Sequence, residues 1–88
     1  MNRVVFKLYI TGDTVIGQNA IKNIEKICSH DTENVYQLDI IDVLQRPELA
    51  EASGIFVTPA LVKTHPNPVC HIVGDLSDTV TILEMLKI

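Results

Sequence analysis

The chain contains no tryptophan, and aromatic residues occupy only 5% of its 88 positions. A core must therefore be built from isoleucine, valine and leucine, within a hydrophobic fraction of 47%. That fraction is sufficient for a packed domain and excludes a disordered chain. The length predicts a single domain over residues 1–88. No hydrophobic run approaches the ~18 residues that span a bilayer, so the sequence predicts no membrane segment.

Cysteine and basic residues are also scarce. Cys28 and Cys70 are the only cysteines, which is too few for a disulfide framework and favours a reducing compartment. No signal-peptide cleavage pattern follows Met1, so we expect a cytoplasmic protein. Seven Lys and Arg residues stand against eleven Asp and Glu residues, giving a net charge of -4. A nucleic-acid surface normally needs a basic patch, so we expect no nucleic-acid partner.

The motifs of cofactor and metal sites are missing as well. No glycine-rich phosphate loop is present, since Gly12 and Gly17 alone are too weak a signal. His30, His65 and His71 share no ligand spacing, and no Cys-x-x-Cys pair accompanies them. The sequence therefore predicts neither a cofactor nor a metal ion.

The first half of the chain predicts two strands joined by a helix. Val4–Ile10 is short, β-branched and apolar on both faces apart from Lys7, as in a central strand. A helix capped by Asp13 or Thr14 should follow. Its apolar stripe comprises Ala20, Ile21, Ile24, Ile27 and Cys28. The segment Val35–Ile41 predicts the second strand.

The second half predicts a short helix, a hairpin and a final helix. The short helix begins at Pro47, and Gly54 suits its C-terminal end. Residues 60–64 and 69–73 should form two strands around a proline-rich turn. The last helix should be capped by Ser77 or Asp75 and run to about Ile88. We expect its inward-facing side chains to be Val80, Leu83, Leu86 and the stem of Lys87. Residues 79–82 are β-branched and would also suit a strand.

The resulting order β-α-β-α-β-β-α predicts a thioredoxin-like α/β fold with a parallel strand pair and an antiparallel hairpin. Redox enzymes of this fold carry a low-pKa cysteine where the first strand turns into the first helix. Residues 11–17 contain no cysteine. Cys28 lies on the apolar stripe, and Cys70 and His71 are strand neighbours that should point to opposite faces. A residual thiol enzyme that uses Cys70 is therefore only an alternative interpretation.

Thr58-Pro59 is the most informative local feature. The proline that opens the third strand of this fold is commonly cis and faces the redox loop. Its presence without the cysteines indicates a binding surface rather than an active site.

Several runs in collinear order over almost the whole chain resemble the KaiB family of circadian clock proteins. The runs are Lys7–Gly12, Ile41–Leu44, Pro47–Glu51, Thr58–Lys63 and Val73–Ser77. The resemblance implies a non-catalytic module that binds a KaiC-like ATPase and modulates its phosphorylation cycle. A clock histidine kinase with a similar sensor domain would compete for the same site. Arg46, Pro59 and Lys63 are the partner-binding residues that the resemblance suggests.

The resemblance also implies a metamorphic chain. Its C-terminal half would have a second, KaiB-type fold in a self-associated dimer or tetramer, with Gly74 and Asp75 at the switching turn. Met85 and Lys87 replace the Gly and Asp of a typical family sequence. Both changes favour a final helix, by ~1 kcal/mol for the glycine and ~0.3–1 kcal/mol for the charge. A KaiB-like stress-response adaptor outside any clock is the other alternative function.

Overall fold

The computed structural model describes residues 3–85 as a four-stranded sheet with three helices. The elements in chain order are β1 Arg3–Ile10, α1 Val15–His30, β2 Val35–Asp42, α2 Pro47–Ala52, β3 Ala60–His65, β4 Cys70–Val73 and α3 Thr79–Met85. The strand order is β2-β1-β3-β4, with β1 and β2 parallel and the other two pairs antiparallel. The predicted element order and the thioredoxin-like sheet are confirmed.

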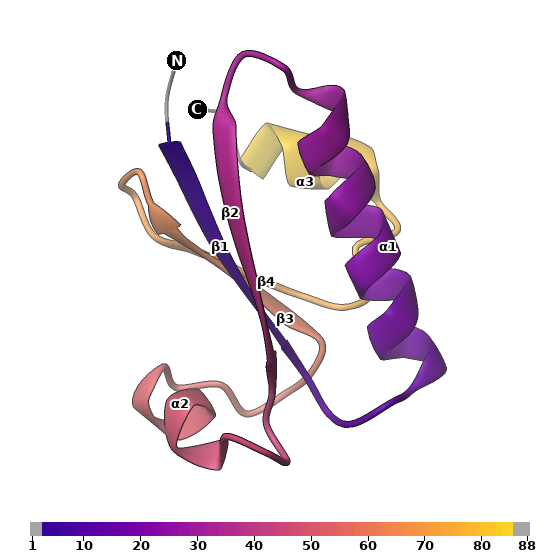
Figure 1. The fold of residues 1–88 in the computed structure, drawn as a ribbon, viewed down its shortest axis with the longest axis vertical. Coiled ribbons are helices and arrows are strands. Elements are labelled where there is room, and N and C mark those ends of the chain that lie inside the picture. Colours follow the sequence, from indigo (N-terminus) through magenta and orange to yellow (C-terminus); the bar gives the residue numbers. More distant parts are fainter. Residues whose placement is uncertain (1–2, 86–88) are drawn as a thin grey trace.

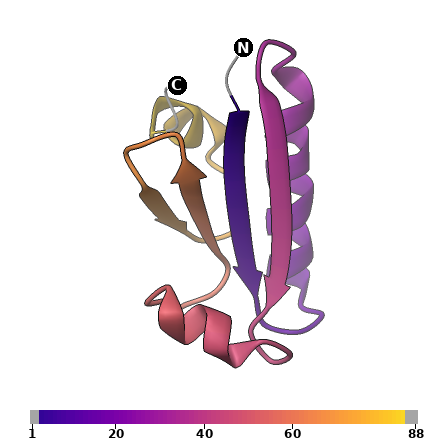
Figure 2. The same ribbon diagram turned by 60° about the vertical axis from the view of Figure 1, so that its left-hand side comes forward.

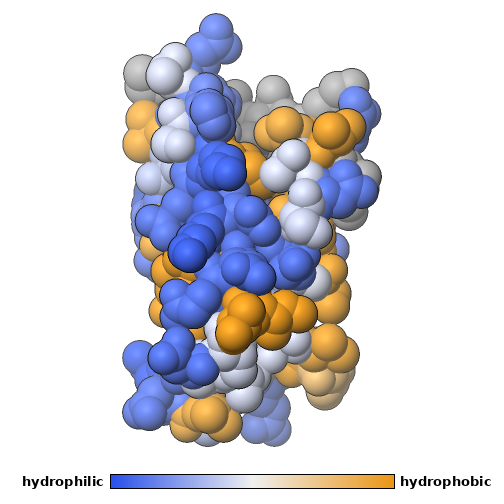
Figure 3. All heavy atoms as spheres, turned by 90° about the vertical axis from the view of Figure 1, so that its right-hand side faces the viewer, coloured by the Kyte–Doolittle hydropathy of each residue, from blue (hydrophilic) through white to orange (hydrophobic). Residues whose placement is uncertain are grey.

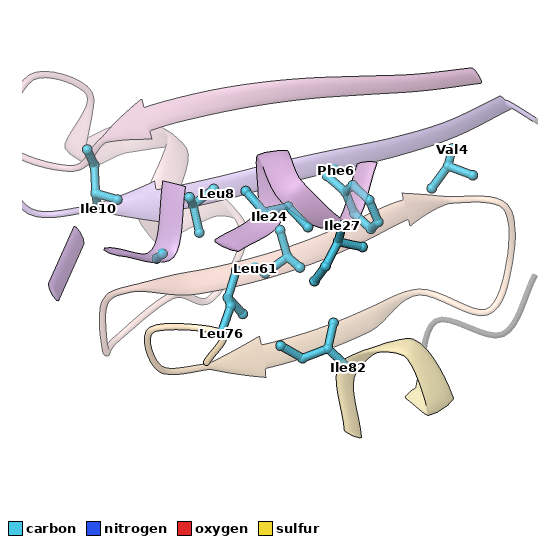
Figure 4. Packing of buried hydrophobic residues seen from close by; sticks show 10 residues of the cluster. Val4, Phe6, Leu8, Ile10, Ile24, Ile27, Leu61, Leu76 and Ile82 are labelled. Carbon is cyan, nitrogen blue, oxygen red and sulfur yellow. The ribbon is translucent and has the colours of Figure 1, made fainter. Parts of the chain in front are cut away.

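The helices cover the two faces of the sheet unequally. Figures 1 and 2 show α1 and α3 on one face, while α2 lies near one end of the other. The larger core lies between the sheet and α1, with Phe6, Leu8 and Ile24 fully buried. Leu76 and Ile82 reach this core from the C-terminal segment (Figure 4). A smaller cluster of Tyr9, Ala50 and Val62 packs under α2.

Local sequence signals explain where α1 and α2 begin and end. Thr14 caps α1, because its Oγ1 accepts a hydrogen bond from the Gly17 N–H at 3.1 Å. A Cβ at Gly17 would lie 2.9 Å from that oxygen, so the cap requires the glycine. Pro47 occupies the first turn of α2, and Gly54 follows the helix with φ +69°, as the sequence predicts.

The final helix differs from the prediction in its start and its buried residue. It begins at Thr79, so Asp78 stands directly before it, while Asp75 accepts the Ser77 N–H within the preceding turn at 3.0 Å. Ile82 is the buried residue, at 3% exposure, whereas Val80 is 71% exposed and Leu83 54%. The prediction that Val80 and Leu83 face inward is therefore wrong. Leu86 and Lys87 lie outside the described residues.

None of the helices among residues 3–85 is long and apolar enough to cross a lipid bilayer.

Candidate partner-binding site

Three connections meet at one end of the sheet, which we call the loop end and define as residues 11–14, 43–46 and 53–59. The parallel strands β1 and β2 both finish here, and β3 begins here (Figure 1). The Thr11 and Thr58 hydroxyls are hydrogen-bonded at 2.5 Å, which joins the first connection to the third. The Thr58–Pro59 peptide bond is cis, as expected, and Pro59 is buried. The turn that would hold a redox cysteine therefore lies beside the cis proline.

Asp42 fixes the shape of the loop end. Its Oδ1 accepts the Gly12 N–H at 3.0 Å and the Leu44 N–H at 2.9 Å. Its backbone carbonyl accepts the Arg46 N–H at 2.9 Å. Gly12 has φ +60°, and a Cβ there would lie 3.2 Å from the Leu44 side chain. One carboxylate thus organises two loops that come from distant parts of the chain.

Large apolar side chains are exposed at the loop end and at the start of α1 directly beside it, among polar residues such as Asp13 and Gln45. Val15 is 80% exposed at the start of α1, Leu44 is 65% exposed, and Val57 is 58% exposed. Figure 3 shows hydrophilic residues over the middle of the α1 side and hydrophobic residues exposed below them. Sequence reasoning missed this surface. The sequence did contain a sign of it. Val15, Leu44 and Val57 lie beside the predicted helix start and the predicted turns, where a core is not expected to cover them.

The suggested partner-binding residues do not all lie together. Arg46 and Pro59 both belong to the loop end. Arg46 is exposed and forms an ion pair with Glu48, at 2.9 Å between Nε and Oε1. The Arg46 hydrogen bond is the main cause that holds the Glu48 pKa below its ordinary value.

Lys63 requires a correction, because its side chain is only 2% exposed. It is the register partner of Phe6 in β1 and of Cys70 in β4. Leu61, two residues earlier in β3, belongs to the larger core. Side chains in a strand alternate between faces, so Lys63 points to the face that α1 and α3 cover. It is not part of the exposed loop-end surface in this fold.

The suggested switching residues Gly74 and Asp75 directly follow β4. Gly74 has φ +121°, and its N–H donates to the Pro59 carbonyl at 2.9 Å. The Asp75 carbonyl accepts a hydrogen bond from the Asn23 side chain at 2.7 Å. The Ser77 hydrogen bonds keep the pKa of the Asp75 carboxyl below its ordinary value. Met85 is the last residue of α3, and Lys87 lies outside the described residues.

The two cysteines lie away from the loop end. Cys28 is half-buried near the end of α1, where burial, followed by the charges of Glu25 and Asp31, raises its pKa to about 11. It is therefore protonated at neutral pH. Cys70 pairs with Lys63 and His71 pairs with Val62, so the Cys70 and His71 side chains point to opposite faces of the sheet, as predicted. Among residues 3–85, no three metal-ligating side chains gather into a site.

Comparison with known proteins identifies the family. The KaiB domain matches residues 7–88. The chain belongs to the KaiB family. It is 49% identical over 88 residues to the circadian clock protein KaiB3 of Synechocystis, covering 100% of this chain and 86% of that protein. It is 47% identical over 79 residues to the circadian clock oscillator protein KaiB of Picosynechococcus, covering 90% of this chain and 76% of that protein.

Solved structures support the same fold. The N-terminal domain of Synechococcus elongatus SasA superposes with a TM-score of 0.80 at 24% identity, over 98% of this chain and 85% of that one. The Drosophila melanogaster thioredoxin Deadhead superposes with a TM-score of 0.77 at 13% identity, over 98% of this chain and 82% of that one. At these identities the likeness concerns the fold alone. This KaiB-family chain thus has the thioredoxin-like architecture throughout its described residues.

Proposed function

We propose that this chain is a non-catalytic module that binds a KaiC-type ATPase through the loop end and modulates its phosphorylation and ATP hydrolysis. Family membership supports the choice of partner, since related chains are named as circadian clock proteins. The observation that carries the proposal is the apolar exposure of Val15 and Leu44 beside a thioredoxin-like turn that contains no cysteine. Exposed apolar residues around a rigid loop are typical of a protein-binding surface.

The structure changes the expected chemistry of that contact. With Lys63 buried, Arg46 is the predicted site residue that offers positive charge at the loop end, and Glu48 already pairs with it. We therefore propose that apolar contact supplies most of the affinity and that Arg46 contributes a smaller, salt-sensitive part. A histidine kinase sensor domain of the same fold, such as the SasA domain, would compete for the same ATPase surface.

The test is a binding titration against a purified KaiC-type ATPase, with its phosphorylation followed in parallel. Leu44→Asp should weaken binding at least about tenfold, because it places a charge in an apolar contact. Val80→Asp is the matched control, since Val80 is 71% exposed on α3, away from the loop end. Equal losses in both variants would contradict the proposed surface. Binding that leaves phosphorylation unchanged would support an adaptor outside a clock.

A further inference from the structure

A pocket of about 270 Å³ opens where the last turns of α1 meet α3, and we call it the helix pocket. Its lining comprises Lys26, Ile27 and His30 of α1 together with Thr79 and Leu83 of α3. Figure 1 shows α3 beside the C-terminal half of α1, and the two helices are in contact. Lys26 lies about 17 Å along the helix from the first residue of α1, which adjoins the loop end. The helix pocket is therefore separate from the proposed partner-binding surface.

The apolar part of the lining offers a place for a hydrocarbon group. Ile27 is 6% exposed and belongs to the larger core. Leu83 is 54% exposed, because α3 turns the neighbouring Ile82 into the core instead. A ligand that covers Leu83 would remove apolar surface from water without any rearrangement of the core. The volume lies just below the ~300–1,000 Å³ of pockets for drug-sized molecules, so the ligand must be small.

The polar part of the lining selects an anion. Lys26, His30 and Thr79 can each donate a hydrogen bond, and none of the lining residues is acidic. Among residues 3–85, no carboxylate forms an ion pair with Lys26. Asp78 and Glu84 are the acidic sequence neighbours of the α3 lining residues, but neither is part of the lining. In a chain with a net charge of -4, a pocket lined only by basic, hydroxyl and apolar side chains is a local exception.

We propose that the helix pocket binds a small hydrophobic carboxylic acid in its anionic form. The hydrocarbon chain lies against Ile27 and Leu83. The carboxylate accepts hydrogen bonds from the Lys26 ammonium, a His30 ring nitrogen and the Thr79 hydroxyl. Hydrogen bonds between an ammonium and a carboxylate are about twice as strong as those between neutral groups, so the charged end fixes the orientation of the ligand.

Occupation of the helix pocket should hold α3 on α1. The lining exists only while α3 is a helix packed beside α1, and α3 has only seven residues. A ligand that binds one conformation raises its population by the factor 1 + [L]/Kd. At a free ligand concentration of about ten times Kd, the ratio of packed to unpacked α3 should therefore rise about elevenfold. The helix pocket is thus a regulatory site for the C-terminal segment, and it does not depend on the proposed function.

Titration of the full chain with sodium octanoate at neutral pH, followed by amide chemical shifts, tests the binding. We expect saturable shifts at the end of α1 and in α3, with a dissociation constant on the order of 1 mM. Butanoate should bind at least about tenfold more weakly, because it lacks four methylene groups. Octylamine has the same chain with the opposite charge and should also bind at least about tenfold more weakly. No shift up to about 10 mM octanoate, or equal affinity for octylamine, would overturn the proposal.

Two pairs of variants locate the ligand. Lys26→Gln should raise the octanoate dissociation constant at least about fivefold, whereas Lys22→Gln, one turn earlier at an exposed position of α1, should leave it unchanged. Leu83→Ser should raise it at least about fivefold, whereas Val80→Ser, at an exposed position of α3 outside the lining, should not. Equal effects within either pair would show that octanoate binds elsewhere. Amide shifts of the sheet verify that each variant keeps this fold.

Hydrogen exchange tests whether the ligand holds α3. At about 10 mM octanoate, the α3 amides should exchange about tenfold more slowly than in the free chain. The amides of α2, near the opposite end of the sheet, should exchange at an unchanged rate (Figure 1). Binding that leaves α3 exchange unchanged would refute the regulatory role of the helix pocket.

Discussion

Tyr9 and Lys63 are both buried polar-ended side chains in the sheet, at 1% and 2% exposure. They face opposite sides. Tyr9 lies in the cluster under α2, where its hydroxyl is hydrogen-bonded to the Ser53 hydroxyl at 2.8 Å. This contact ties the end of α2 to the central strand, and so helps to place the loop that precedes Pro59.

The Tyr9 hydroxyl should contribute measurably to stability. Tyr9→Phe keeps the ring but leaves the part-buried Ser53 hydroxyl without this partner, so we expect the free energy of unfolding to fall by about 1 kcal/mol. Urea denaturation measures the change. Ser53→Ala and the double variant complete a cycle whose coupling should be about 0.5–1.5 kcal/mol. Additive effects of the two substitutions would show that the hydrogen bond between Tyr9 and Ser53 contributes nothing to stability.

Lys63 should limit the stability of this fold. Lys63→Met keeps an unbranched side chain of similar length and removes the cost of burying an ammonium, so we expect the unfolding free energy to rise by about 1 kcal/mol. Lys22→Met, at an exposed position of α1, should change it by less than about 0.5 kcal/mol. Urea denaturation of both variants measures this difference. A loss of stability in Lys63→Met would mean that the ammonium makes a favourable contact.

Asp31 and Tyr36 form a hydrogen-bonded pair where α1 leads into β2. The Tyr36 hydroxyl donates to Asp31 Oδ2 at 2.5 Å, and its ring stacks on Phe6 with centroids 5.7 Å apart. The Tyr36 hydrogen bond, followed by those from Asn34 and the Glu33 backbone, lowers the pKa of Asp31 below its usual 3.8. Burial, followed by the hydrogen bond to Asp31, raises the pKa of Tyr36 to about 12.

Tyr36→Phe should therefore raise the pKa of Asp31 towards 3.8, as measured by NMR titration of its carboxyl carbon. A depressed folded-state pKa stabilises the fold above the unfolded-state pKa, and this stabilisation is lost as pH falls through the folded-state value. The wild type should thus lose more stability than Tyr36→Phe as pH falls below about 4. An unchanged Asp31 pKa in the variant would contradict the role of the Tyr36 hydrogen bond in lowering that pKa.

At the scale of elements, the C-terminal segment is held by few contacts. α3 has seven residues, too few to be stable alone, and Ile82 is its buried side chain among those described. Leu76, just before it, has φ +64° and is 3% exposed. Left-handed backbone costs a non-glycine residue about 1–2 kcal/mol, and burial of the leucine side chain offsets that cost. Packing against the sheet and α1 therefore decides the conformation of this segment.

The fold preference of residues 79–88 can be tested by restoring the typical family residues. Met85→Gly together with Lys87→Asp should disfavour the final helix by about 1–2 kcal/mol, because glycine is a poor helix former and an acid near a helix C-terminus is unfavourable. Chemical shifts should report a smaller helical population of residues 79–85 in dilute solution, and sedimentation should report more tetramer. Lys22→Asp alone matches the charge change of Lys87→Asp at an exposed position of α1. A wild type that is fully tetrameric with a terminal strand at low micromolar concentration would refute the predicted helix preference.

At the scale of the whole molecule, a thioredoxin-like sheet carries a KaiB-family sequence. The position of the redox loop is kept, together with the neighbouring cis proline, but the loop is built from Thr11, Gly12 and Thr14. The protonated, half-buried Cys28 cannot replace the missing thiolate.

The protein should therefore not reduce insulin disulfides at neutral pH above the rate without protein. Turbidity of insulin with a dithiol reductant measures this, with a thioredoxin as the positive control. The Cys70→Ser variant shows whether any reduction above that rate depends on the Cys70 thiol. Turnover that this substitution abolishes would restore the thiol-enzyme interpretation.

The sequence alone determined the element order, the parallel and antiparallel pairings and the family. These depend on local patterns such as the apolar Val4–Ile10 run, the Thr14 cap and the prolines, which act over a few residues. Only the tertiary structure decided the burial of Lys63, the choice of Ile82 over Val80, and the exposure of Phe56. Each depends on which neighbouring element covers a given face: β3 lies beneath α1 and α3, whereas no described element covers the loop after α2. A linear pattern states that a residue is apolar or charged, but the packing of distant segments decides whether water reaches it.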